Sequence, residues 1–406
     1  MKLKFEVLTS NRKWRSPVGA LVALAMALQA CASVPPRNAL PEELIDKATV
    51  PGGPTTRMWG DALPANFDKR LEIFADQLAD KGDEDVFTQR INYLSISGGG
   101  ANGAFGAGLL KGWTESGTRP EMWIVTGIST GALIAPFAFL GSSYDDELEN
   151  LYTTMSTSDL VKKRSLLKGL TGDAMADTSP LRELLQKYID EEMIEDIAQE
   201  YARGRRLLIG TTNLDAKRPV IWNIGAIAEV GTAESAQLIR DVMLASASIP
   251  GLFPPVRITV QVGEQVYDEL HVDGGVSSQV FLYPAQMDLR AAAAVVGATG
   301  AQTMYVIRNS ILQPRWSEVT PKLRPVTVAS ISTLIRTQGM GDLYRLFLGA
   351  KRDDLPFRLA YIPASFDLEP EESFDPKYMR ELFDFAYELA RDGYDWETSP
   401  PGVALP

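Results

Sequence analysis

Two glycine-rich stretches decide the fold of this chain: Ser97-Gly98-Gly99-Gly100-Ala101-Asn102-Gly103 and Gly127-Ile128-Ser129-Thr130-Gly131. Each follows an apolar run typical of a buried strand, and the second also precedes an apolar run typical of a helix. The second stretch has the pattern G-x-S-x-G of a nucleophile elbow, in which a serine lies on a sharp turn between a strand and a helix. The sequence therefore predicts that Ser129 is a nucleophile at the end of a strand.

The first stretch allows three interpretations. Gly98, Gly100 and Gly103 fit the dinucleotide-binding pattern G-x-G-x-x-G, which requires an acidic residue about twenty positions further on, at the end of the next strand. That strand ends at Thr126 without an acid, which argues against a nucleotide. A tight turn without a ligand remains open. The third interpretation is an oxyanion hole, because consecutive glycines let backbone N–H groups converge on one point and the following helix adds its positive end.

The rest of the chain predicts strands that alternate with helices. Residues 141–204 are expected to be helical, including one helix capped by Thr178 and Ser179, and Asp375 is expected to cap a final helix. This alternation predicts an α/β domain with a largely parallel central sheet. Strands are expected over 91–97, 122–126, 205–213, 219–224, 265–272, 304–308 and 357–362, and further helices over 66–81, 132–140, 239–247 and 326–347.

Composition excludes several classes of function. The 406 residues suffice for one large domain or two modest ones, and an apolar content of 45% suits a packed core. The net charge of −12 argues against nucleic acid as a partner. A single cysteine excludes an intrachain disulfide, and with a single histidine it disfavours a His/Cys metal site. We therefore expect no metal and no cofactor.

The N-terminal residues predict that the protein is a lipoprotein. A basic segment precedes the apolar run Val18 to Leu28, which is too short to span a bilayer. The run ends in Leu28-Gln29-Ala30-Cys31, which resembles the lipobox of bacterial lipoproteins. The resemblance implies that residues 1–30 are removed as a signal peptide and that Cys31 is lipidated. An ordinary secretory signal cleaved nearby remains the alternative.

Loss of the signal peptide makes the chain more acidic. Residues 1–30 carry five basic side chains and one acidic side chain, so the net charge changes from −12 to −16. Such a chain gains little from anionic lipid, and a lipid anchor would have to hold it at the membrane. In lipoproteins of enteric-type bacteria, Asp in the place of Ala32 would favour retention at the inner membrane, so the resemblance implies the outer membrane of a bacterial cell envelope. Residues 32–64 are rich in Pro and Gly and predict a tether with little regular structure.

A serine nucleophile needs a base, and the sequence offers two candidates. His271 is the single histidine, but it lies two residues before Asp273, so the two would not stack as in a Ser-His-Asp triad. Asp273 ends a predicted strand and is followed by Gly274-Gly275, which leaves space around its carboxylate. Asp273 is therefore the better base, although an ordinary turn aspartate stays open. For His271 a packing or hydrogen-bonding role is the simpler reading.

Four ordered motifs resemble the patatin-like phospholipases, which are lipid acyl hydrolases with a Ser–Asp dyad. They are the two glycine-rich stretches, the segment 245–255 and Asp273-Gly274-Gly275, with the resemblance running over about 91–281 and again over 374–394. The resemblance implies a three-layer α/β fold, with Ser129 as nucleophile and Asp273 as base. It also implies an oxyanion hole formed by the amides of Gly98, Gly99 and Gly100, with that of Thr130. Asn102 stands where many members carry Arg or Lys, which leaves the head-group preference open.

The resulting hypothesis divides the chain into four parts: 1–30 signal peptide, 31–90 tether and helix, 91–310 catalytic core, and 311–406 C-terminal extension. The implied activity is hydrolysis of fatty-acyl esters in membrane lipids. The alternatives are an esterase for small soluble esters and an idle lipid-binding lipoprotein. Intact Ser129, Asp273 and triple glycine argue against the idle form. Residues 249–255 and the helices of 141–204 are expected to line the acyl site. The sequence leaves the oligomeric state open.

Overall fold

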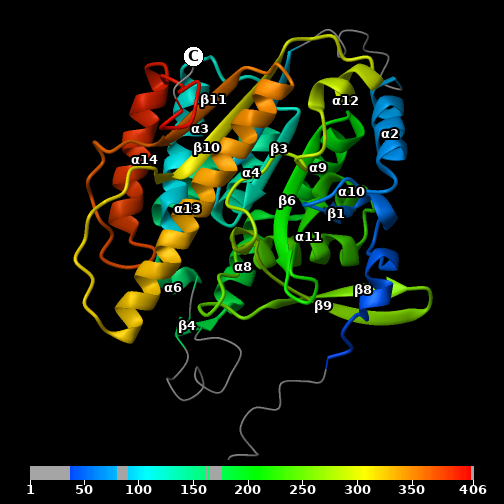
Figure 1. Ribbon diagram of the computed structural model, residues 1–406, viewed down its shortest axis with the longest axis horizontal. Helices are drawn as coiled ribbons and strands as arrows, with labels where there is room; N and C mark the ends of the chain where they lie inside the picture. Colours follow the sequence, from blue (N-terminus) through cyan, green and yellow to red (C-terminus); the bar gives the residue numbers. More distant parts are fainter. Residues whose placement is uncertain (1–36, 80–89, 161, 164–175, 404–406) are drawn as a thin grey trace, which may run out of the picture.

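The computed structural model describes residues 37–79, 90–160, 162–163 and 176–403 (Figure 1). The predicted signal peptide and Cys31 lie outside the described residues.

The core of the described chain is a nine-stranded sheet with strand order β1-β7-β6-β3-β2-β10-β11, which the hairpin β8–β9 joins through β6. The five neighbours β6, β3, β2, β10 and β11 are parallel, and the other pairings are antiparallel. The α/β fold class is therefore confirmed, with a parallel centre and an antiparallel end. The strands are β1 (Arg57–Trp59), β2 (Ile91–Ile96), β3 (Ile124–Ile128), β6 (Arg206–Asn213), β7 (Arg218–Asn223), β8 (Val256–Val262), β9 (Gln265–Asp273), β10 (Gln302–Ile311) and β11 (Phe357–Ile362).

Helices cover both faces of this sheet. The α-helices are α2 (Phe67–Ala79), α3 (Gly103–Glu115), α4 (Thr130–Leu140), α5 (Asp145–Thr154), α6 (Thr157–Leu160), α8 (Ser179–Tyr188), α9 (Glu191–Ala202), α10 (Ile224–Ala228), α11 (Ala233–Ser246), α12 (Leu289–Val295), α13 (Leu323–Arg352) and α14 (Pro376–Arg391). Short 3₁₀ turns are η1 (Glu42–Lys47), η2 (Gly53–Thr55), η4 (Gly100–Asn102), η5 (Ser142–Tyr144) and η6 (Gly274–Val276), and the short strands β4 (Lys162–Lys163) and β5 (Ala176–Asp177) pair with each other.

The side chains of β10 show why the sheet has two covered faces. Successive side chains of a strand point to opposite faces. Met304 and Val306 pack with Leu343 and Phe347 of α13, whereas Ile307 packs in the larger core. That larger core includes residues of α3, α4 and α14. The three layers are visible in Figure 1, where α13 crosses in front of the sheet.

The C-terminal helix α14 is tightly joined to α3. Gly108 and Gly112 of α3 permit this contact, because a Cβ at either position would lie 2.2 Å from a backbone carbonyl oxygen of α14. As predicted, Asp375 caps α14, and its Oδ1 accepts from the amides of Lys377 and Tyr378 at 2.9 and 3.3 Å. The first glycine-rich stretch leads into α3 at Gly103. Because α14 packs against α3, it helps to hold that stretch in place.

One predicted helix cap holds by position without its side-chain hydrogen bond, and one predicted helix start was wrong. The cap expected at Thr178 makes no side-chain hydrogen bond, and Asp177 accepts from the amide and hydroxyl of Ser179 instead. The helix expected over 239–247 begins at Ala233, where Thr232 and Ser235 form a capping box. Polar residues in the first turns of α11 hid its start from the apolar pattern.

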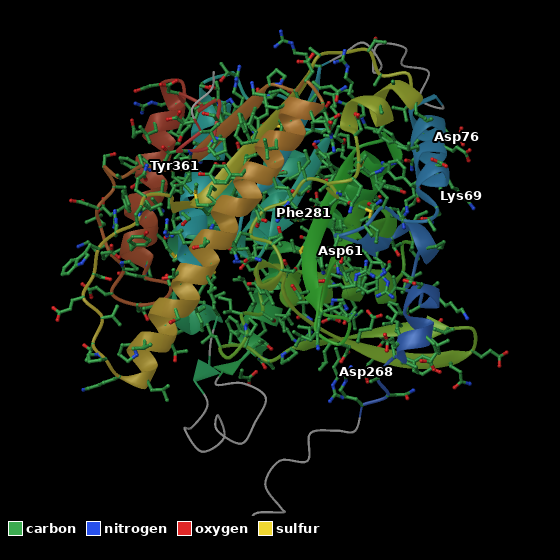
Figure 2. The ribbon with its side chains drawn as sticks, viewed as in Figure 1. Asp61, Lys69, Asp76, Asp268, Phe281 and Tyr361 are labelled. Carbon is green, nitrogen blue, oxygen red and sulfur yellow. The ribbon has the colours of Figure 1, made fainter. Side chains whose placement is uncertain are left out.

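The expected tether is also corrected, because residues 37–59 pack against the domain. Arg37 donates to Asp268 at 2.6 Å and to Asp215 at 2.7 Å, and β1 pairs with β7. Figure 2 labels Asp268 on the hairpin at the lower edge of the molecule. The Pro and Gly residues form tight turns such as Gly52, with φ of 89°, and the segment buries Leu40 and Val50.

Candidate active site

Ser129 lies on a strained turn between β3 and α4. Its φ of 55° and ψ of −125° fall in a region that non-glycine residues rarely adopt. The two glycines of the motif make the turn sterically possible. A Cβ at Gly127 would lie 2.3 Å from the Gly131 carbonyl oxygen, and a Cβ at Gly131 would lie 2.3 Å from that of Ile96. The geometry is that of a nucleophile elbow.

Asp273 faces Ser129 from the end of β9. The Ser129 hydroxyl donates to Oδ2 of Asp273 at 2.7 Å, and the Gly275 amide donates to Oδ1 at 2.7 Å. Pairing of β9 with β6 holds the strand end, because Asp273 stands opposite Thr211. The fold therefore brings together two side chains that are 144 positions apart in sequence.

The carboxyl group of Asp273 has an altered acidity. Burial raises its pKa to about 6, while the hydrogen bonds from Ser129 and Gly275 act in the opposite direction. Desolvation disfavours the charged form of a carboxyl group, which makes the anion a stronger proton acceptor. A pKa of about 6 places this group close to the range useful to a general base at neutral pH.

The amides proposed for the oxyanion hole surround Ser129 but are not equivalent. The Gly98 amide donates to the Gln279 carbonyl oxygen at 3.2 Å, so it is engaged within the fold. The hydrogen bonds found among the described residues include none from the amides of Gly99 and Gly100. Thr130 is the first residue of α4, where helix amides lack intrahelical partners. Gly99, Gly100 and Thr130 are therefore the available donors.

The end of β10 supports the glycine stretch in a way that the sequence did not indicate. The Asn309 side chain donates to the Ser97 carbonyl oxygen at 2.9 Å and accepts from the Gly106 amide at 3.0 Å. Arg308 is buried and donates to the Gly98 carbonyl oxygen at 3.1 Å. A Cβ at Gly99 would lie 2.3 Å from the Asn309 carbonyl oxygen, so the close approach requires glycine there.

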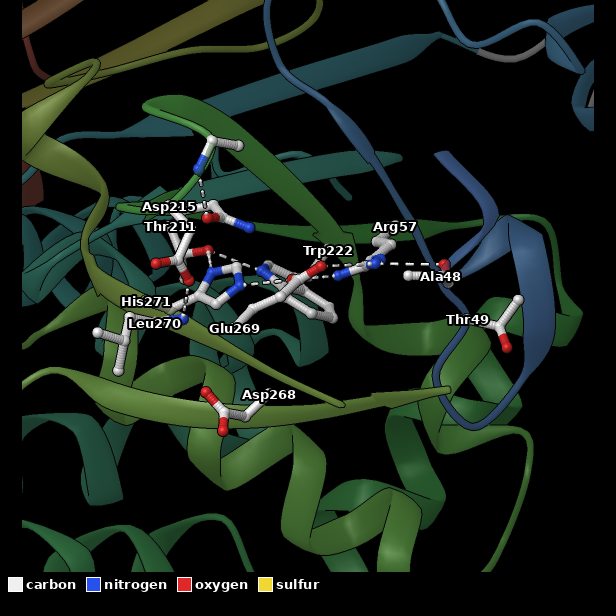
Figure 3. Close-up of polar contacts among 12 residues, drawn as sticks. Ala48, Thr49, Arg57, Thr211, Asp215, Trp222, Asp268, Glu269, Leu270 and His271 are labelled. Atoms are coloured by element: carbon white, nitrogen blue, oxygen red, sulfur yellow. Dashed lines mark hydrogen bonds and ion pairs between the residues drawn. The ribbon is translucent and has the colours of Figure 1, made fainter. Parts of the chain in front are cut away.

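His271 is buried in a separate hydrogen-bond network (Figure 3). Its Nδ1 lies 2.9 Å from Thr211 Oγ1, and its Nε2 lies 3.0 Å from Glu269 Oε2. Trp222 donates to Thr211, and Arg57 donates to Glu269 at 2.6 Å. One neutral tautomer satisfies every link: Thr211 donates to Nδ1, and Nε2 donates to the carboxylate. Among the described residues, His271 makes no hydrogen bond to the serine or aspartate of the site.

Burial and nearby charges keep His271 neutral and Glu269 ionised. Burial lowers the pKa of His271, against the raising effect of Glu269. Burial alone would raise the pKa of Glu269, but the hydrogen bond from His271 and the charge of Arg57 lower it to about 2. The histidine is therefore neutral and structural at neutral pH.

An apolar pocket of about 30 Å³ lies beside Ser129. Residues from 249–255 and from 141–204 contribute to it, as the sequence predicted, together with Phe374, which the sequence did not indicate. Asn102 lies nearby, and its Oδ1 accepts from the Tyr378 hydroxyl at 2.7 Å. The pocket is lined by Gly100, Ser129, Thr130, Leu133, Met155, Leu160, Leu181, Ala247, Ile249, Phe253 and Phe374.

The described residues show neither a cluster of metal-binding side chains nor a membrane-spanning helix. They contain no group of three or more His, Cys, Asp or Glu side chains that could hold a metal ion. None of the helices within these ranges is both long enough and apolar enough to cross a membrane.

Comparison with known proteins identifies the domain. Residues 94–285 match the family model described as patatin-like phospholipase. The chain therefore carries a patatin-like phospholipase domain, as its four motifs predicted. No curated protein matches the chain.

Three solved structures are similar at low TM-scores. VipD from Legionella pneumophila is 12% identical, with 75% of this chain and 66% of that chain covered and a TM-score of 0.36. Human GIVD cytosolic phospholipase A2 is 12% identical, with 80% and 54% covered and a TM-score of 0.29. ExoU of Pseudomonas aeruginosa, in complex with SpcU, is 14% identical, with 75% and 52% covered and a TM-score of 0.23. The chain thus spans less than two thirds of each relative.

Proposed function

We propose that this protein is a lipid acyl hydrolase that cleaves fatty-acyl esters through Ser129 and Asp273. The observation that carries the proposal is the 2.7 Å hydrogen bond from the Ser129 hydroxyl to Asp273 Oδ2 on a strained elbow. The patatin-like phospholipase domain over residues 94–285 supports the same class of reaction.

The reaction has two halves. In the first, Ser129 Oγ attacks the ester carbonyl carbon while Asp273 takes the hydroxyl proton, and the alcohol leaves with that proton. In the second, Asp273 takes a proton from water, whose oxygen attacks the acyl carbonyl carbon. The bond from that carbon to Ser129 Oγ breaks, Asp273 returns the proton to Ser129, and the fatty acid is released. The amides of Gly99, Gly100 and Thr130 donate to the oxyanion in both halves. Each such donor is worth roughly 3–4 kcal/mol of transition-state stabilisation.

The apolar lining of the pocket supports a fatty-acyl substrate. The side chains around Ser129 include Leu133, Leu160, Leu181 and Phe253, which offer no partner to a charged or strongly polar acyl group. A second candidate is an esterase for small soluble esters, which the small volume of about 30 Å³ favours. Rates on a series of esters that differ only in acyl length would separate the two functions.

We further propose that the protein is a lipoprotein of a bacterial cell envelope, anchored through Cys31, with the outer membrane favoured. The lipobox-like sequence 28–31 and Ala32 motivate this proposal. It places the site next to membrane lipid, the substrate proposed above.

A fluorophosphonate probe tests the proposed nucleophile. We expect the probe to label the wild-type protein once, on Ser129, and to leave Ser129→Ala unlabelled. Ser156→Ala, a change close to the pocket, serves as the matched control and should label as the wild type does. Labelling of another serine with Ser129 untouched would refute the assignment. Lipid profiling of products from mixed membrane lipids would then identify the ester that is cleaved.

A further inference from the structure

The first half of α13 exposes an unusual apolar surface. Leu323 is 87% exposed and Leu334 is 69% exposed, and Trp316, in the loop before the helix, is 89% exposed. Residues 325–335 contain no charged side chain. We call this surface the α13 patch; it consists of Trp316, Leu323, Val326, Val328, Ile331, Leu334 and Ile335.

Two hydroxyls of this helix segment are exposed but are hydrogen-bonded to the helix's own backbone. The Ser330 hydroxyl donates to the Val326 carbonyl oxygen at 2.8 Å, and the Thr333 hydroxyl donates to that of Ala329 at 2.8 Å. A hydroxyl that bonds back to the preceding turn donates its proton within the helix. A helix in water normally shows a charged outer face, and a contiguous exposed apolar surface marks an interaction site.

The start of α13, which carries the patch, lies at the same edge of the molecule as α6, a helix that contributes to the pocket beside Ser129. In Figure 1, the start of α13 reaches the lower edge, where α6, β4 and the first described residues also lie. Leu160 of α6 lines the pocket beside Ser129. A surface that met this edge would therefore meet the side of the molecule on which the acyl pocket is built.

The chain before Arg37 limits how far this end can stand from a membrane. Cys31 lies six positions before Arg37, and Arg37 is held by Asp268 and Asp215. Six extended residues span roughly 20 Å at most. An acyl anchor on Cys31 would thus keep the first described residues, at the lower edge of Figure 1, within about that distance of the bilayer.

We propose that the α13 patch is the surface on which the protein rests on a lipid bilayer, with its apolar side chains in the headgroup and acyl boundary. This rests on the proposed function and anchor. Tryptophan suits that boundary because its ring is apolar and its N–H is polar. The mature chain is acidic, so the contact depends on apolar burial and changes little with salt or with the fraction of anionic lipid.

A depth measurement tests the contact directly. The full chain, with Leu334→Cys or Leu348→Cys carrying an environment-sensitive fluorophore, is reconstituted on phosphatidylethanolamine and phosphatidylglycerol vesicles that contain brominated lipid. The two positions lie on one helix and are 69% and 65% exposed, so they are matched. The probe at Leu334 should lose most of its emission, and the probe at Leu348 should not. The parent chain taken through the same labelling gives the background.

Three results would overturn the proposal. The first is equal quenching, or no quenching, at both positions. The second is shielding of the Leu334 probe without vesicles in a protein that sediments as a dimer, which would make the patch a contact between copies. The third is shielding only when a soluble protein is added, which would make it a protein docking site.

Hydrolysis of vesicle lipid by variants of the α13 patch provides a second, independent test of the proposal. Ile331→Gln combined with Leu334→Gln should lower hydrolysis of vesicle lipid by at least about tenfold, since two apolar side chains lose their burial. Leu348→Gln should leave it unchanged. Probe labelling of Ser129 and hydrolysis of a soluble short-chain ester should be unchanged in both variants. If the double variant hydrolyses vesicle lipid at the wild-type rate, the proposed role of the α13 patch is refuted. If the fluorophosphonate probe does not label the parent protein, the proposed function is refuted, and the depth measurement remains valid.

Discussion

Arg308 donates to the carbonyl oxygen of Gly98 at 3.1 Å, although 210 positions separate the two residues. The Ser97 hydroxyl donates to the same oxygen at 2.7 Å. The Gly98 carbonyl and the Gly99 N–H belong to one trans peptide and point in opposite directions. Fixing the carbonyl therefore fixes the direction of a candidate oxyanion donor, and a nearby positive charge polarises that N–H. Burial lowers the pKa of Arg308 to about 10, so it remains charged at neutral pH.

Arg308 is thus a positioning residue, and its removal should affect the transition state. We expect Arg308→Met to lower kcat by about tenfold to a hundredfold, less than the complete loss of a donor, with KM for a soluble ester nearly unchanged. Arg308→Lys should restore part of kcat. Steady-state kinetics with a soluble short-chain ester measures both constants, and Arg336→Met is the control. An unchanged kcat in a folded Arg308→Met protein would contradict this role.

The proposed anchor gives a prediction at Cys31. Cells fed a clickable palmitate analogue should incorporate label into the wild-type protein, because the thiol of Cys31 would carry an acyl chain. Cys31→Ser should abolish the label, and Ser33→Ala, two residues away, should keep it. The measurement is gel fluorescence of the purified protein together with mass spectrometry of its N-terminal peptide. A wild-type N-terminus at a position other than Cys31 would show an ordinary signal peptide.

The local parts of the site could be predicted from the sequence, and the distant parts could not. Ser129 and Asp273 were identifiable because each lies in a short motif whose glycines are required by local geometry. The contacts of Arg308 and Asn309 depend on the pairing of β10 with β2, which no local pattern encodes. Similarly, the engagement of the Gly98 amide by Gln279 depends on a fold-level contact.

The N-terminal segment shows the same limit. Its Pro and Gly content resembles that of a tether, but Arg37 and β1 find partners more than a hundred and fifty positions away. Strand β8 was missed although its apolar residues alternate with Arg257 and Thr259, which is the pattern of a strand with one buried face, and it pairs with β9 in a hairpin.

The acidity of Asp273 predicts the pH dependence of the reaction. The base works when it is deprotonated, so kcat/KM should fall as the pH drops through about 6, the pKa set by burial. Because His271 is outside the site's hydrogen bonds, this acidic limb should survive in His271→Ala. The pH profile of kcat/KM on a soluble ester tests this. A limb that disappears with the imidazole would assign it to His271.

The same raised pKa predicts that ionised Asp273 destabilises the folded protein. The folded-state pKa of about 6 lies above the ordinary value of 3.8 for an aspartate, so ionisation of Asp273 is harder in the folded protein. The stabilising contribution is present below the unfolded pKa and is lost as the pH rises through about 6. Asp273→Asn should therefore raise the free energy of unfolding at pH 8 by up to about 3 kcal/mol, and by much less at pH 3.5. Urea unfolding at both pH values measures the difference, and Asp268→Asn, which loses an ion pair, should not show it.

The choice of base is the sharpest test, because the sequence offers His271 and Asp273 within three residues. Asp273→Asn keeps the shape of the side chain and removes the proton acceptor 2.7 Å from Ser129 Oγ, so kcat/KM should fall by about two to four orders of magnitude. His271→Ala removes links to Thr211 and Glu269 and leaves the Glu269 carboxylate with Arg57 as its remaining side-chain partner. We expect that variant to lose stability while keeping most of its activity below its melting temperature. Both variants should be assayed on one soluble ester after circular dichroism has verified folding. A folded His271→Ala protein as inactive as Asp273→Asn would show that the reaction depends on histidine, and the Ser–Asp dyad would have to be abandoned.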